Sequence, residues 1–567
     1  MAHRAPASTL ATHTVTNQPP DFAPRDLWQT DPALREAVRR EGAGWAEDAL
    51  AALGLEAGGE RVMELGDLAN RNPPVLKTFD RYGHRIDEVE FHPAYHALMD
   101  MAFRHRIHSV AWTSPTEIPS SGPQDPNRRG GHVAHAAMGY LMTQAEAGVL
   151  CPVAMTYASV PALRRQPELA EEWLPRILSD RHDPRFLPPG EKTGVTVGMA
   201  MTEKQGGSDV RANSTVARPL GAGGPGGEYA LTGHKWFCSA PMSDAFLTLA
   251  QTERGLSCFL VPRWRPDGTR NAFRLQRLKD KLGNRSNASA EIEYDGAWGL
   301  LIGEEGRGVS GIIEMVHHTR LDCGFAAAGL MRAALSRALH HAAHRSAFGR
   351  RLIEQPAMRP VLADLALESE AAITLVLRVA RAFDEGESNP EARAFARLAV
   401  AIAKYWITKR CPAVVYEALE CHGGNGYVED GGMPRLYREA PLNAIWEGSG
   451  NVIALDVLRT LQREPAALAA LEAELGAVRG MDGRLDLWVR DTRAMLADPA
   501  TLELQARRLV ERLALALQAG LLLRHAPPAV AEAFCASRLG GDWGHCFGTL
   551  PPTVDSGAIL ARATGEA

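Results

Sequence analysis

The stretch GVTVGMAMTEKQGGSDV, residues 194–210, marks a change in the character of the chain. Before it, from about residue 30, apolar residues recur at helical spacing behind capping residues. From it onward, short apolar or alternating runs are separated by turn residues, which is typical of β-strands. About a hundred residues of this kind predict an antiparallel β domain that follows a helical one.

From about residue 308 the pattern is helical again. The run EMVHHTRLDCGFAAAGLMRAALSRALHHAAHRSAF is rich in small residues, which suits helices packed closely in a bundle. Helices, then strands, then helices predict an α+β fold of separate blocks. The predicted domains are a helical 1–192, a β domain at 193–307, a bundle at 308–460 and a further helical region at 461–567.

Composition narrows the class of protein. The 567 residues are 45% hydrophobic and 23% charged, and the formal charge of −5 provides no general attraction to nucleic acid or anionic membranes. No apolar run approaches the ~20 residues of a membrane span. Eight cysteines without paired spacing predict reduced, buried thiols in a cytoplasmic protein. The first twenty residues lack a secretory core, and we expect a short disordered lead rather than a transit peptide.

Two polar motifs accompany the predicted strands. MTEKQGGSDV, at 201–210, offers the hydroxyls of Thr202 and Ser208 beside open glycine backbone, which suits the carbonyls and phosphates of a cofactor. In GHKWFCS, at 233–239, strand alternation places Phe237 and Ser239 on one face, where a flat ring could stack and hydrogen-bond. Taken alone, an ordinary turn and core aromatics explain both.

Two further motifs interrupt the helices. HRSAFGRRLIEQPAMR, at 344–359, carries Arg345 and Gln355, and arginine suits a pyrophosphate; a solvated helix end is the alternative. ECHGGNGYVED, at 420–430, is a glycine loop that either approaches a phosphate or caps a helix. The Pro/Ser/Gly-rich segment 114–131 is a predicted loop without an assigned function.

Other glycine and histidine patterns in the sequence do not predict a binding site. GAGGPGGE, at 221–228, precedes no helix, so a hairpin loop is favoured over a phosphate cradle. His340 and His344 are one helical turn apart but lack an acidic third ligand, so no metal site is predicted. Rossmann, Walker A and GxSxG motifs are absent. A dinucleotide must therefore bind by another route.

In PLNAIWEGSGNVIALDVLR, at 441–459, Glu447 follows the apolar pair Ile445 and Trp446 and precedes Gly-Ser-Gly. A surface loop acid is one interpretation. The other is a general base, because apolar surroundings raise the pKa of a carboxyl group toward neutrality.

In order and spacing, AMTEKQGGSD, GHKWFCS, KLGNRSNAS, HRSAFGRRLIEQ, ECHGGNGYVEDGGMPRLYRE and IWEGSGN resemble the successive motifs of FAD-dependent acyl-CoA dehydrogenases. The resemblance spans most of 190–460 and is closest to the AidB-type branch, linked to the adaptive response to DNA alkylation. HTVTNQP and EGAGW, near the start, also resemble that branch. It implies FAD between the β domain and the bundle, a homotetramer, an acyl-CoA substrate and an acceptor such as an electron-transfer flavoprotein.

Carried onto this sequence, the resemblance implies Glu447 as the base, while Thr319 occupies the position that other members use. Thr202, Ser208 and Ser239 would bond the flavin ring or its phosphates, and Gly424 and Asn425 would contribute across a dimer. The full set of implied FAD contacts is Met201, Thr202, Gly207, Ser208, Phe237, Cys238, Ser239, Arg345, Phe348, Gln355, Gly424, Asn425, Ile445, Trp446, Gly448, Ser449 and Asn451.

Two functions follow from the resemblance. One is dehydrogenation of a short or branched acyl-CoA, in the manner of isovaleryl-CoA dehydrogenase. The other is a flavoprotein that binds double-stranded DNA, with weak or vestigial dehydrogenase activity. Residues 461–567 hold 11 Arg and no Lys against 13 acidic residues, so this region is not a basic tail. Arg459 would lie at the active-site entrance, near CoA phosphate or DNA.

Overall fold

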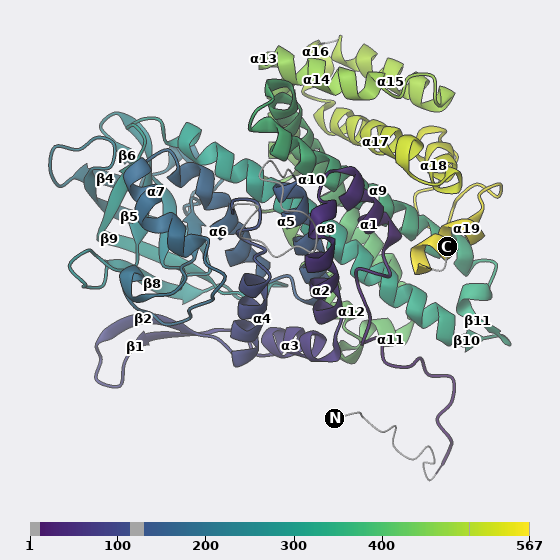
Figure 1. The fold of residues 1–567 in the computed structure, drawn as a ribbon, viewed down its shortest axis with the longest axis horizontal. Coiled ribbons are helices and arrows are strands. Elements are labelled where there is room, and N and C mark those ends of the chain that lie inside the picture. Colours follow the sequence, from purple (N-terminus) through teal and green to yellow (C-terminus); the bar gives the residue numbers. More distant parts are fainter. Residues whose placement is uncertain (1–11, 114–129, 498, 566–567) are drawn as a thin grey trace.

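The computed structural model describes residues 12–113, 130–497 and 499–565, so the predicted loop at 114–131 lies almost entirely outside them. In Figure 1 the β-sheet forms one side of the molecule and the long bundle helices its centre. The last helices lie against the other side of the bundle. This is the predicted order of blocks.

The N-terminal part is mainly helical. Its helices are α1 (Pro32–Arg40), α2 (Glu47–Ala57), α3 (Glu60–Arg71), α4 (Pro93–Arg104), α5 (Gly131–Ala145), α6 (Leu150–Leu163) and α7 (Pro167–Ile177). Helix α1 starts where predicted, because the Asp31 carboxylate accepts a hydrogen bond from the Leu34 N–H at 3.1 Å and Pro32 follows it.

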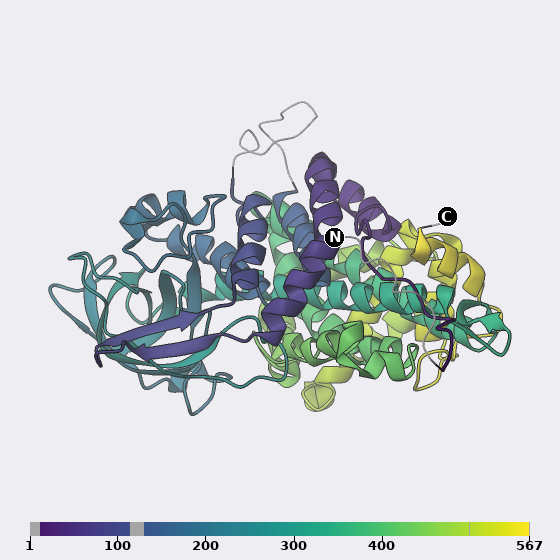
Figure 2. The same ribbon diagram turned by 90° about the horizontal axis from the view of Figure 1, so that it is seen from below.

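One hairpin departs from the helical prediction for 1–192. Strands β1 (Val75–Phe79) and β2 (Arg85–Glu90) pair antiparallel and, in the view from below in Figure 2, cross in front of the β domain. The Asp87 carboxylate accepts a hydrogen bond from the Leu275 N–H at 3.1 Å, which ties the hairpin to that domain. The alternating pattern of VLKTF and RIDEVE suits strands, and it is too short to show in a helical window.

The β domain holds β3 (Val197–Ala200), β4 (Val216–Pro219), β5 (Glu228–Ser239), β6 (Ala245–Thr252), β7 (Gly255–Pro262), β8 (Phe273–Leu278) and β9 (Ser289–Ile302). GAGGPGGE joins β4 to β5 as a hairpin loop, as predicted. The sheet is antiparallel except that β3 and the start of β4 pair parallel with β6. The expectation of a wholly antiparallel domain is therefore wrong at this point, because β3 reaches β6 through a long crossover rather than a hairpin.

Both faces of the sheet are buried. Along β6, Phe246 points into an apolar cluster with Phe259 and Phe273, whereas Leu247 points into a second cluster that includes Cys151 of α6. Residues of α6 and of the long helix that begins at Gly308 therefore cover the second face. This arrangement brings β5, α6 and the bundle to one place.

The bundle contains α8 (Gly308–His344), α9 (Met358–Gly386), α10 (Pro390–Glu420), α11 (Gly424–Tyr427), α12 (Met433–Glu439) and α13 (Gly450–Arg463). The 37 residues of α8 extend about 55 Å. Helix α5 crosses α8 closely: a Cβ on Gly139 would lie 2.3 Å from the Phe325 ring, and one on Gly329 would lie 2.8 Å from the Tyr140 carbonyl oxygen. Small residues therefore permit the packing, as predicted.

A short hairpin, β10 (Ser346–Ala347) and β11 (Arg350–Arg351), interrupts the helices after α8. Beyond the bundle lie α14 (Pro465–Gly476), α15 (Gly483–Leu496), α16 (Pro499–Leu502), α17 (Ala506–His525), α18 (Pro528–Phe534) and α19 (Ser556–Thr564). Helix α13 continues past residue 460, and the chain turns at Pro465, which cannot continue a helix.

Candidate active site

The loop that carries Glu447 has an unusual backbone. Glu447 has a φ of 56° and Gly448 a φ of 110°, and a left-handed conformation costs about 1–2 kcal/mol for a residue with a side chain. The Arg320 Nε donates to the Glu447 carbonyl oxygen at 3.3 Å, and the Lys404 Nζ donates to the Gly448 carbonyl oxygen. Two cations from α8 and α10 thus hold the loop in this conformation.

The surroundings of the Glu447 carboxyl group favour its neutral form. Burial raises its pKa above the ordinary value, while Thr319, Arg320 and Lys404 act in the opposite direction. Thr319 therefore lies beside Glu447, so the two positions implied for the base meet in space. The Glu447 N–H has no hydrogen-bond partner among the described residues, and it is free to donate to a ligand.

A neighbouring carboxylate pairs with the arginines beside the loop. Asp456 on α13 lies 2.7 Å from Arg320 Nη1 and 3.0 Å from Arg397 Nη2. Burial opposes ionisation, but the two arginines outweigh it and lower the pKa of Asp456 to about 2. Arg459 lies 3.8 Å from Asp456 and its side chain is 59% exposed. It thus lies at the open side of this cluster.

The β domain contributes the opposite side of the site. On β5, the Phe237 side chain is half-exposed, and the Ser239 Oγ lies 3.2 Å from the Ser289 Oγ. Cys238 points the other way, into the apolar core of the β domain. Its side chain cannot contact a cofactor, because successive strand residues face opposite sides of a sheet; only its backbone is available.

Cys151 of α6 connects the two sides. Burial raises its pKa to about 11, and its thiol interacts with Lys281, Ser239 and Glu447. Met201 and Trp446 pack against the same apolar cluster as Cys151. The structure thus brings Met201, Ser239, Trp446 and Glu447 together from three parts of the chain.

The residues implied for FAD fit such a group at this end. A Cβ on Gly207 would lie 2.3 Å from the Thr202 Oγ1, so the turn after β3 is a close cradle that requires glycine. Helix α13 starts after Ser449 without a side-chain cap, which leaves its first N–H groups, including that of Asn451, for an anion. Ile445 is 63% exposed, as an apolar wall facing a ligand would be.

The other implied FAD contacts lie far away in the same chain. Arg345 follows Thr319 by 26 residues, about 39 Å along α8. The rings of His341 and His422 are 4.7 Å apart, which places Gly424 and Asn425 at the same end as Arg345. Phe348 is fully exposed there, and Gln355 donates to the Ala347 carbonyl oxygen at 2.8 Å. These residues cannot meet a ring that lies beside Glu447 of their own chain.

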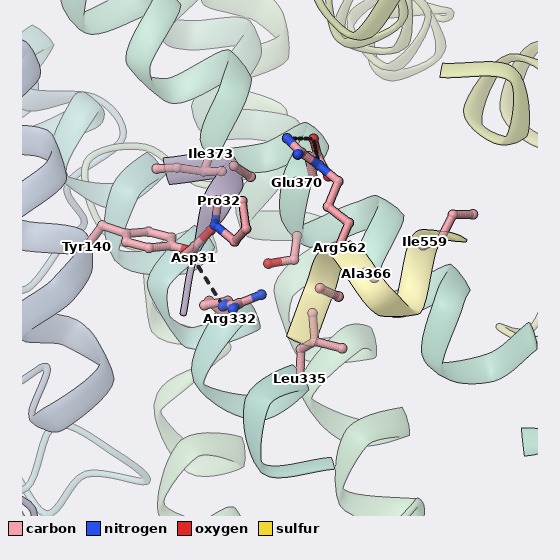
Figure 3. A pocket seen from close by; sticks show the side chains of 13 residues that line it. Asp31, Pro32, Tyr140, Arg332, Leu335, Ala366, Glu370, Ile373, Ile559 and Arg562 are labelled. Atoms are coloured by element: carbon pink, nitrogen blue, oxygen red, sulfur yellow. Dashed lines mark hydrogen bonds and ion pairs between the residues drawn. The ribbon is translucent and has the colours of Figure 1, made fainter. Parts of the chain in front are cut away.

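Two cavities differ in size and in their distance from the candidate site. The hollow in Figure 3, lined by Asp31, Arg332 and Arg562 among others, has room for about one water at 20 Å³ and lies about 20 Å from Thr319 along α8. A larger cavity of about 180 Å³ adjoins Pro152 and Ala240, the neighbours of Cys151 and Ser239. Only the second is next to the candidate site.

The structure also places the histidine pair and the cysteines. His340 bonds to the Pro20 carbonyl oxygen, and within the described ranges no group of three potential ligands could hold a metal. No helix in the described part of the chain is long and apolar enough to cross a membrane. All eight cysteines are free; seven are buried as predicted, whereas Cys546 is exposed, so the prediction of a buried thiol is wrong there.

Sequence reasoning did not single out Arg320, Lys404, Cys151 or Lys281. Arg320 directly follows Thr319, so the motif that supplied Thr319 contained the signal. Lys404 is the only cation among the buried residues of α10, and in the sequence it stands inside the apolar run LAVAIAKYWI, where a lone lysine is unusual. Nothing in the sequence around Cys151 distinguishes it from a core residue.

Comparison with known proteins agrees with this geometry. Residues 17–184 match the N-terminal domain of adaptive response protein AidB, 198–297 the middle domain and 306–462 the C-terminal domain of acyl-CoA dehydrogenases. The chain is 47% identical to AidB of Escherichia coli (strain K12) over 555 residues, 98% of each chain. It is 31% identical to acyl-CoA dehydrogenase family member 11 of Caenorhabditis elegans, over 81% of this chain and 75% of that one.

A solved structure supports the same assignment. Caenorhabditis elegans ACDH-11 in complex with C11-CoA superposes with a TM-score of 0.83 at 28% identity, over 95% of both chains. The match covers the N-terminal helices, the β domain, the bundle and the added C-terminal helices together. The chain therefore belongs to the acyl-CoA dehydrogenase family of FAD-dependent oxidoreductases, in its AidB branch.

Proposed function

We propose that this chain dehydrogenates a short or branched-chain acyl-CoA, with Glu447 as the base that removes the α-proton. The observation that carries the proposal is the state of Glu447: its pKa is raised by burial, its N–H is free, and the nearby cations contact carbonyl oxygens of its loop. C11-CoA bound to the related ACDH-11 supports an acyl-CoA as ligand.

The chemistry follows from these groups. A thioester α-proton is weakly acidic, so negative charge that develops on the thioester oxygen must be stabilised. The Glu447 N–H is placed to donate to that oxygen while the Glu447 carboxylate takes the proton. A raised pKa makes the carboxylate a stronger base near neutral pH. Bound FAD supplies the acceptor for the β-hydride.

The residues of this chain that would contact FAD fall into two groups. We propose that Met201, Thr202, Gly207, Ser208, Phe237, Ser239, Ile445, Trp446, Gly448, Ser449 and Asn451, with the backbone of Cys238, contact the flavin and its phosphates. Arg345, Phe348, Gln355, Gly424 and Asn425 serve the adenosine end of a site in a second copy, because about 39 Å separates Arg345 from Thr319. This arrangement requires an oligomer, and a homotetramer accommodates it.

The test is a screen of flavin bleaching with short, branched and long acyl-CoA thioesters under anaerobic conditions. Loss of the flavin absorbance with at least one thioester, followed by reoxidation by an electron-transfer flavoprotein, is expected. An absorbance that stays unchanged with every thioester contradicts the proposal.

Duplex DNA is the alternative ligand, and the charges of the C-terminal region bear on it. Six of the 11 arginines there are paired with carboxylates: Arg484 with Asp482 and Glu532, Arg490 with Asp491, Arg493 with Glu472, Arg524 with Glu474, Arg538 with Asp364 and Glu368, and Arg562 with Glu36 and Glu370. Paired charges weaken attraction to phosphate. A titration of duplex binding against salt tests this alternative, which requires binding at low salt that weakens steeply as salt rises.

A further inference from the structure

The N-terminal motif HTVTNQP has no place in the proposed chemistry, yet the structure gives it specific contacts. Residues 17–25, here called the strap, run along the far end of α8 toward α2. The strap meets residues 345–351, here called the Arg345 hairpin, whose Arg345 is proposed above to contact the cofactor.

Asn17 makes three hydrogen bonds to the base of the hairpin. Its Nδ2 donates to the Ser346 carbonyl oxygen at 2.8 Å, and its Oδ1 accepts from the Ser346 N–H at 2.7 Å. The Arg345 Nη1 donates to the Asn17 carbonyl oxygen at 2.6 Å. One side chain thus satisfies both backbone groups of Ser346, and the Asn17 backbone orients the guanidinium.

The hairpin needs such support because its tip is strained. Phe348 has a φ of 52° and Gly349 a φ of 79°, which are the two left-handed residues of a two-residue hairpin turn. A phenylalanine in this conformation, with a fully exposed ring, is costly unless its surroundings hold it. Two residue pairs join the strands of the hairpin, and at its base the Leu352 N–H donates to the Arg345 carbonyl oxygen at 2.8 Å.

The rest of the strap is anchored firmly. The Phe22 ring packs edge-on against His340 at 5.5 Å and lies under the Arg337 guanidinium at 4.5 Å. The Arg25 N–H donates to the Gly58 carbonyl oxygen at 2.9 Å, and a Cβ on Gly58 would lie 1.7 Å from the Arg25 carbonyl oxygen. The close approach at Gly58 means that the strap is built into the fold and is not a loose lead.

We propose that Asn17 is a positioning residue for the cofactor: the strap holds the Arg345 hairpin in the conformation that captures the adenosine and pyrophosphate end of FAD. This inference rests on the proposed role of Arg345. Preorganisation strengthens binding because less conformational freedom is lost when the ligand arrives. Arg345 keeps donors for phosphate oxygens, since only its Nη1 is used by Asn17.

The test measures how fast the full-length protein with bound FAD releases it, followed by the rise of free-flavin fluorescence after dilution. Asn17→Ala is expected to release FAD about tenfold faster. Asn17→Asp, which keeps the acceptor for Ser346 and loses the donor, is expected to show a smaller increase. Gln18→Ala is the matched control, because Gln18 is exposed on the same strap and bonds to nothing described.

A second measurement follows the hairpin itself. Trypsin cleavage after Arg350 and Arg351 in the full-length protein is expected to accelerate several-fold in Asn17→Ala and to stay unchanged in Gln18→Ala. If FAD release and trypsin cleavage are unchanged in Asn17→Ala while FAD release is fast in Arg345→Ala, the proposed role of the strap is wrong and the cofactor contact of Arg345 stands. Wild-type release in Arg345→Ala overturns the proposed cofactor contact, whatever Asn17→Ala does.

Discussion

Glu447 and Glu368 lie in the same helical bundle, and their surroundings have opposite effects. Glu368 on α9 lies 2.8 Å from Arg538 Nη2 and 3.3 Å from Arg410 Nε. Burial disfavours its charge, but Arg410 and Arg538 outweigh burial and lower its pKa. At Glu447 burial prevails and the pKa is raised.

The difference lies in what the cations touch. Arg538 and Arg410 contact the Glu368 carboxylate itself and join the C-terminal region to α9 and α10. Arg320 and Lys404 contact the carbonyl oxygens of Glu447 and Gly448. Direct pairing stabilises the charge of Glu368, whereas contact with the backbone holds the Glu447 loop in place and leaves burial to set the pKa of its carboxyl group.

The largest expected effect is at the proposed base, Glu447. Glu447→Gln should slow flavin reduction by acyl-CoA about 10³-fold, since general base catalysis contributes 10²–10⁴-fold. The FAD content should not change. Stopped-flow absorbance measures the rate, with Glu472→Gln as control because Glu472 forms an exposed pair with Arg493. A rate within threefold of wild type means that Glu447 is not the base.

The next effect concerns stability and should differ between the two acids. Glu368→Gln should lower the free energy of unfolding by about 3 kcal/mol, because two buried arginine contacts lose their counter-charge. At pH 7 Glu447→Gln should not lower it, since a raised pKa means that folding disfavours the ionised form.

Urea unfolding at pH 7 compares both variants with Asp491→Asn, which breaks an exposed pair worth about 0–1 kcal/mol. Equal losses for Glu447→Gln and Glu368→Gln would contradict the distinction drawn between the two acids.

A smaller effect is expected from the cation that holds the loop. Lys404→Met removes the donor to the Gly448 carbonyl oxygen and should slow flavin reduction about tenfold, or about 1.4 kcal/mol. Loss of its charge also raises the pKa of Glu447 further, which should move the rising part of the pH–rate profile to higher pH. Lys77→Met, at an exposed pair with Glu90, is the control and should change neither.

The smallest expected effect is a difference between the pH at which flavin reduction is lost and the pH at which the fold is lost. The raised pKa of Glu447 means that flavin reduction is lost as pH falls through that value. The stability supplied by Glu368 is present above its unfolded pKa and is lost only as pH falls through its lowered folded value.

A pH interval should therefore exist in which circular dichroism shows a folded protein that no longer reduces flavin. Burial lowers the pKa of Lys404 to about 8, so the rate should also decline above that pH, and not in Lys404→Met. Activity and fold that fail together on acidification would contradict the first expectation.

Much of the fold could be predicted, because apolar residues recur at helical spacing before 194–210 and in short or alternating runs typical of strands after it. The hairpin at 75–90 escaped because five- and six-residue strands leave too short a pattern among helices. The parallel pairing of β3 escaped because register between distant strands depends on packing and not on local pattern.

For the site, the sequence by itself determined the candidate residues: Glu447 next to an aromatic and Gly-Ser-Gly, Thr319 at the competing position, and the hydroxyls beside glycines at 202–208. Only the tertiary structure decided which of them meet. It brought Thr319 to Glu447, placed Arg345 at the far end of α8, turned Cys238 into the core, and supplied Arg320 and Lys404 to the loop carbonyls. The physical reason is that residue type and spacing act within a few turns of one element, whereas burial, charge balance and contact arise between elements that only folding brings together.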